Sequence, residues 1–154
     1  MTKLFKAMML AIFAMGFCAT VASAGERGTL DEAKAMVKKA RAYMREQGAE
    51  KAFAEFSNPK GKFHDRDLYI YVYDKKGKNV AHGANPRLIG KDLIDLRDID
   101  GVYMVKGLLE AAQKGSGTLN FKFVNPVSKV IEPKIGYAEM EGDYMVGSGV
   151  YANQ

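Results

Sequence analysis

Residues 68–84, LYIYVYDKKGKNVAHGA, decide the fold of this chain. Residues 68–73 are rich in aromatic and β-branched side chains, which are typical of a strand. Residues 74–78 are charged and include Gly77, as expected for a hairpin turn, and residues 79–84 supply the returning strand. The stretch therefore predicts two neighbouring antiparallel strands.

Three more strands are predicted downstream, over residues 117–124, 130–141 and 144–152. Asn125-Pro126 and Gly142-Asp143 provide the turns between them. Before these strands, apolar side chains recur at helical spacing over residues 98–114, and the glycines at 115 and 117 end that helix.

The N-terminal part predicts helices over residues 29–56. Thr29 or Asp31 can cap the start, and Thr29 and Glu32 have the spacing of a capping box. Gly48 divides the segment into a long helix and a short one over residues 49–56. Helices that cover a five-stranded antiparallel sheet make an α+β domain, and the long helix ahead of the sheet indicates a PAS-like arrangement.

Residues 1–24 have the pattern of a secretory signal peptide. Lys3 and Lys6 precede an uncharged run over residues 7–19, and Ala22-Ser23-Ala24 supplies the small residues of a cleavage site. We expect cleavage after Ala24, export to the periplasm and a single mature domain over residues 25–154; the alternative is a retained membrane anchor. A lipid-modified Cys18 is disfavoured because Phe17 stands where a small residue is required.

The composition excludes several classes of protein. Cys18 is the only cysteine, so the mature chain has no disulfide and no thiol nucleophile. Without Lys3 and Lys6 the chain keeps 21 basic and 18 acidic side chains. The basic side chains form no dense stripe, so no nucleic-acid partner is expected.

The order of these segments resembles the single Cache domain family, whose members are sensor domains outside bacterial membranes. The resemblance rests on residues 69–74 and 76–80, 81–86 and 89–93, 98–101, 125–126, 133–137 and 146–151. It implies a PAS-like fold that binds small molecules, often short organic acids, on one side of its sheet.

Family members usually sit between two membrane helices, ahead of a kinase or chemotaxis domain. This sequence ends at Gln154, three residues after the last matched one. We therefore expect a free-standing domain that works with a separate membrane sensor kinase or chemoreceptor. Related domains often pair through the long helix, which makes a homodimer an open alternative.

The resemblance also assigns the ligand site. The family lysine that points into the ligand pocket corresponds to Lys134; without the resemblance, a strand lysine is usually solvated. Tyr69 and Tyr71 alternate on one face with Tyr73, where they either line the pocket or pack under a helix. Tyr103 and Lys106 are expected on the helix that covers the pocket in this family. Tyr137 is three residues after Lys134, so it is expected on the opposite face of an ideal strand.

His82 has two interpretations that the sequence leaves open. Its imidazole either donates a hydrogen bond to a ligand or fixes the loop that follows. His64 and His82 lie far apart in the sequence, so no metal site is predicted. We also expect no cofactor; a haem bound through His82 would be the alternative, and no haem-attachment motif supports it.

The sequence contains no catalytic constellation, so we do not expect an enzyme. The prediction is a periplasmic sensor domain for a short organic acid, with ligand contacts from Lys134, Tyr69, Tyr71, His82 and Tyr103. The alternative is a protein-interaction or dimerisation module with an empty pocket.

Overall fold

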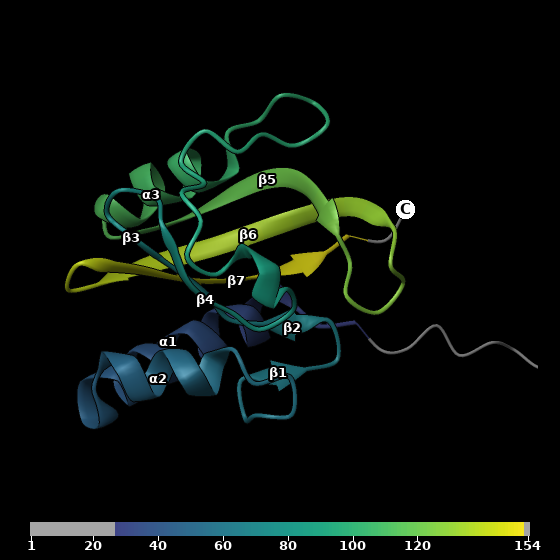
Figure 1. The fold of residues 1–154 in the computed structure, drawn as a ribbon. Coiled ribbons are helices and arrows are strands. Elements are labelled where there is room, and N and C mark those ends of the chain that lie inside the picture. The colour runs from purple at the N-terminus through teal and green to yellow at the C-terminus, as the bar shows by residue number, and fades with distance from the viewer. Residues whose placement is uncertain (1–26, 153–154) are drawn as a thin grey trace, which may run out of the picture.

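A computed structural model describes residues 27–152 of the chain (Figure 1). The predicted signal peptide, its cleavage site and Cys18 lie outside the described residues. None of the helices in the described part is long and apolar enough to cross a membrane.

Two helices open the described chain, as predicted. Helix α1 spans Leu30–Gln47 and α2 spans Ala49–Phe56. Thr29 and Glu32 form the expected capping box, in which each side chain bonds the other residue's backbone N–H. Gly48 separates the helices at a φ of 82°, a conformation that glycine adopts without strain.

A five-stranded antiparallel sheet follows, in the order β4-β3-β7-β6-β5. This confirms the predicted α+β class. The bounds are β3 Tyr71–Asp74, β4 Asn79–His82, β5 Ser116–Val124, β6 Ile131–Glu141 and β7 Tyr144–Tyr151.

The strand predicted over residues 68–73 is interrupted at Ile70. Leu68–Tyr69 forms a separate strand, β2, which pairs with β1 (His64–Asp65) in a small hairpin that the sequence analysis missed. The Ile70 carbonyl instead accepts the Gly83 N–H at 2.9 Å, so the backbone changes partners at this residue.

The middle helix begins later than predicted. Helix α3 spans Met104–Gln113, and residues 98–103 form a loop. The Asp98 carboxylate accepts backbone N–H groups from Asp100, Val102 and Lys122 at 2.8–2.9 Å. These bonds compete with helical backbone pairing, which explains why the helix starts only after the loop.

Helices cover both faces of the sheet (Figure 1). Because side chains alternate along a strand, Ile70 and Val72 pack with α1 and α2, whereas Tyr69, Tyr71 and Tyr73 pack with α3. Between β4 and α3 runs a long connection that includes a 3-10 turn at Pro86–Leu88. The site described next lies on the α3 side.

Candidate ligand-binding site

Lys134 occupies the middle of the sheet, on the face covered by α3. It lies on β6 between Phe121 of β5 and Tyr151 of β7, and its side chain is 2% exposed. Its Nζ donates to the hydroxyl of Tyr69 at 2.8 Å and to that of Tyr151 at 3.3 Å. The amine therefore points into the protein and not into solvent.

The amine of Lys134 has no acidic partner within the described part of the chain. None of the ion pairs found among residues 27–152 includes it. Burial lowers the pKa of Lys134 to about 7, a shift that the Asp67 carboxylate only partly offsets. Asp67 is itself buried, and its Oδ1 accepts the Gly28 N–H at 2.8 Å.

The hydroxyls around this amine have a defined direction of donation. Tyr151 donates to the Val124 carbonyl at 2.7 Å, so its oxygen is an acceptor for Lys134 and for Tyr69, whose hydroxyl lies 3.2 Å away. Tyr71 donates to the Ser148 carbonyl at 2.8 Å. In the ligand-free protein Tyr69 thus donates its hydroxyl proton to Tyr151 and accepts a hydrogen bond from the amine, while Tyr71 offers mainly its ring.

His82 combines the two roles left open by the sequence. Its Nδ1 accepts the N–H groups of Ala84 at 3.3 Å and Asn85 at 3.0 Å, which fixes the loop after β4. Burial, with a smaller contribution from Lys134, lowers the pKa of His82 to about 3, so the ring is neutral. With Nδ1 accepting, the proton must be on Nε2, which makes that atom a donor.

These side chains line one cavity of about 30 Å³ under α3. Lys134, His82, Tyr69, Tyr71 and Tyr73 form its polar part. The other lining side chains are apolar: Leu96, Met104, Val105, Leu108, Phe121 and Phe123. The volume exceeds the roughly 10–15 Å³ that one water molecule requires, and it suits only a compact ligand.

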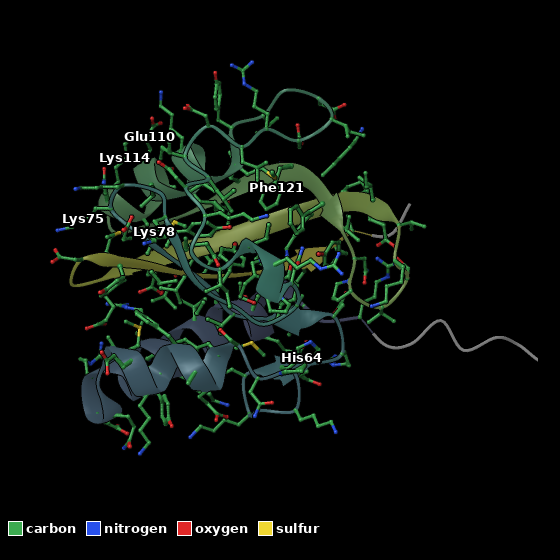
Figure 2. All side chains as sticks on the ribbon, in the orientation of Figure 1. His64, Lys75, Lys78, Glu110, Lys114 and Phe121 are labelled. Atoms are coloured by element: carbon green, nitrogen blue, oxygen red, sulfur yellow. The ribbon has the colours of Figure 1, made fainter. Side chains whose placement is uncertain are left out.

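Other residues considered in the sequence analysis lie elsewhere. Tyr103 does not line this cavity; its ring stacks on the Arg97 guanidinium, which bonds its hydroxyl. Lys106 is exposed, and Tyr137 faces α1 as the strand alternation predicted. His64 lies on β1, far from the cavity residue Phe121 (Figure 2), and residues 27–152 contain no cluster that could hold a metal ion.

Tyr151 is the main site residue that sequence reasoning missed. Its ring centroid is 4.6 Å from the Lys134 Nζ, on the strand next to β6. The sequence feature that could have pointed to Tyr151 was the predicted pairing of residues 130–141 with residues 144–152. Only the register of that pairing, which places Tyr151 opposite Lys134, brings the two together.

A known protein family matches most of this chain. The single Cache domain 2 family matches residues 7–154. The chain belongs to this family. Its relatives are sensor domains of chemoreceptors and histidine kinases.

Two relatives share about 30% of their aligned residues with this Cache domain. The sensor histidine kinase MctS of Rhizobium johnstonii is 30% identical over 90 residues, which are 57% of this chain and 20% of the kinase. A solved methyl-accepting chemotaxis protein from Vibrio parahaemolyticus is 32% identical with a TM-score of 0.70, covering 79% of this chain and 86% of that one.

A third comparison concerns the fold alone. A Cache chemosensory domain solved to explain carboxylic acid recognition is 23% identical, with a TM-score of 0.64 over 80% of this chain and 88% of that one. The Cache domain spans a fifth or less of the length of its curated relatives.

Glycines on the inner face of this Cache domain make room for the site. A Cβ built on Gly147 would lie 2.7 Å from Tyr71 Cζ, and one on Gly149 would lie 2.9 Å from Lys134 Cε. Both glycines lie on β7 on either side of Ser148, so the Gly-Ser-Gly sequence serves close packing against the tyrosine and the lysine.

The substitution Gly147→Ala is expected to destabilise the fold by about 1–3 kcal/mol, because overpacking displaces the Tyr71 ring or the strand. Urea denaturation measures the difference. The matched control is Asn120→Ala on an exposed position of β5, which should change the unfolding free energy by less than about 0.5 kcal/mol. Equal stability of the two variants would contradict the packing role of Gly147.

Proposed function

We propose that this Cache domain is a periplasmic sensor that binds a short organic carboxylate through Lys134. The observation that carries the proposal is a buried amine without a carboxylate partner. A buried charge is costly unless it is paired, and a bound carboxylate would provide the missing counter-charge together with a charge-assisted hydrogen bond.

The donors around the cavity suit one small anion. Lys134 Nζ, the Tyr69 hydroxyl and His82 Nε2 are donors of three different side chains around the same space. Carboxylate oxygens accept several hydrogen bonds, whereas an ammonium ligand would only add a second cation next to Lys134. The apolar side chains of α3 and β5 would contact the short carbon chain of the acid.

Calorimetry of the mature domain tests this function. We expect acetate, propionate, lactate or pyruvate to bind, and the neutral amides acetamide and propionamide not to bind. A ceiling of about 1.5 kcal/mol per non-hydrogen atom limits acetate to a Kd of about 40 μM at best, so titrations should extend to millimolar ligand. Equal binding of acids and amides would contradict recognition by charge.

Thermal shifts across a broad metabolite set separate this proposal from its rival. A ligand that binds only the folded state raises the melting temperature, and the stabilisation grows as RT ln(1 + L/Kd), where L is the free ligand concentration. If no acid raises it and the domain nevertheless forms a stable complex with a receptor or with itself, the interaction module with an empty pocket is the better description.

The signalling role is part of the same proposal. Relatives of this Cache domain belong to histidine kinases and chemoreceptors, so we expect a membrane protein of one of these classes to respond to its ligand state. Export and cleavage after Ala24 would place the domain in the same compartment as the ligand; N-terminal sequencing of protein from the periplasm of the host tests the cleavage site.

A further inference from the structure

The surroundings of the Lys134 amine are those of a nucleophile as well as of an ion-pair partner. Its Nζ lies 4.1 Å from the ring centroid of Tyr69, 4.6 Å from that of Tyr151 and 5.5 Å from that of Tyr71. The side chain is 2% exposed and belongs to none of the ion pairs in the described part of the chain. Such desolvation activates lysine amines toward carbonyl groups.

A free lone pair is available near neutral pH. Burial lowers the pKa of Lys134 to about 7, so about half of the molecules carry a neutral amine at that pH. A lysine with the ordinary pKa of about 10.4 is almost fully protonated at that pH. The amine therefore differs from the surface lysines both in its location and in its protonation.

Proton donors stand next to this amine. The Tyr69 hydroxyl is 2.8 Å from Nζ, and its proton is not required by the backbone, unlike that of Tyr151. His82 lines the same cavity with its Nε2–H, because its Nδ1 is occupied by two backbone N–H groups. A carbonyl compound in the cavity would thus meet a nucleophile together with O–H and N–H groups that can donate hydrogen bonds to its oxygen.

We propose that Lys134 forms a reversible imine with a small 2-oxo acid bound in this cavity. The inference rests on the proposed function, since it uses the same cavity and the same preference for a carboxylate. It adds covalent capture, which would distinguish 2-oxo acids from other acids of equal size.

The reaction balances without an oxidant or reductant. The Nζ lone pair attacks the carbonyl carbon, a C–N bond forms, and the electron pair of the C=O π bond moves to oxygen, which takes a proton as nitrogen loses one. The resulting hydroxyl leaves as water after a second protonation, while the nitrogen lone pair forms the C=N bond. A protonated imine keeps the positive charge beside the carboxylate of the ligand.

Reductive trapping of the full-length protein as purified from its host tests the proposal. Pyruvate is the probe, cyanoborohydride the reductant and intact mass with peptide mapping the readout. We expect one 1-carboxyethyl group per chain, located on Lys134, with labelling at pH 7 at least about a hundredfold faster than at any exposed lysine, because of their different neutral fractions. Lactate, which has no carbonyl group, should give no label.

Two variants complete the experiment. Lys106→Met should be labelled like the wild type, whereas Lys134→Arg, which keeps the cation but cannot form an imine, should not be labelled. If pyruvate and lactate both bind in calorimetry but pyruvate leaves no label, or labels lysines without preference, covalent capture is wrong and the carboxylate sensor stands. If neither acid binds and no label appears, both proposals fail.

Discussion

Replacing Lys134 with methionine is expected to weaken binding of the short carboxylate by up to about a hundredfold. A hydrogen bond to a charged group contributes up to about 3 kcal/mol, which corresponds to about a 150-fold change in Kd. Methionine has a similar length and no charge, so it removes the counter-charge of the ligand without opening a large cavity. Isothermal calorimetry measures the loss.

The same substitution should leave the ligand-free protein at least as stable as the wild type at pH 7. The wild-type amine is buried with only two tyrosine hydroxyls as partners, and replacing a buried charge by an apolar side chain is often neutral or stabilising. Loss of binding together with full stability cannot result from misfolding.

The matched control is Lys106→Met, which removes a lysine from an exposed position of α3. It should retain the wild-type affinity and stability. If Lys134→Met binds the acid as tightly as Lys106→Met does, Lys134 does not contact the ligand, and the proposed site is wrong.

The parts of this site that sequence could predict depend on the two-residue period of strands. The period places Tyr69 and Tyr71 on one face, and it places Tyr137 on the face opposite Lys134. Each of these predictions needs only the residues of one strand. The role of Lys134 came from the resemblance, and its burial agrees with that role.

The parts that sequence could not predict depend on contacts between distant segments. Tyr151 reaches Lys134 only through the register of β6 with β7, which no local pattern specifies. Tyr103 was expected over the pocket because it lies on the predicted middle helix, which covers the pocket in the family that the sequence resembles. The Asp98 carboxylate instead holds the loop through three backbone N–H groups, and Tyr103 stacks on Arg97 outside the cavity.

The free energy of unfolding of the ligand-free protein is expected to rise by about 2 kcal/mol between pH 7 and pH 9. The folded protein holds Lys134 with a pKa of about 7, whereas the unfolded chain restores its ordinary value of about 10.4. In this window the unfolded state therefore binds more protons than the folded state, and stability increases with pH.

Other titrating groups act outside this window. The neutral His82 has a folded pKa of about 3, so its contribution to stability is lost as the pH falls from about 6.5. Burial raises the pKa of Tyr73 to about 12, so ionisation in the unfolded state lowers stability above pH 10. Between pH 7 and pH 9, the change in the free energy of unfolding therefore comes from Lys134.

Urea denaturation at pH 7, 8 and 9 checks this dependence, with Lys134→Met as the control that should remove the slope. A bound carboxylate should also remove it, since the counter-charge raises the pKa of the amine. Binding then takes up a proton, and the affinity for the acid should fall about tenfold per pH unit well above pH 7. Parallel stability curves for the wild type and Lys134→Met would show that the buried amine does not titrate in this range. The affinity for the acid should then not change between pH 7 and pH 9, because the ligand carboxyl group is fully ionised there.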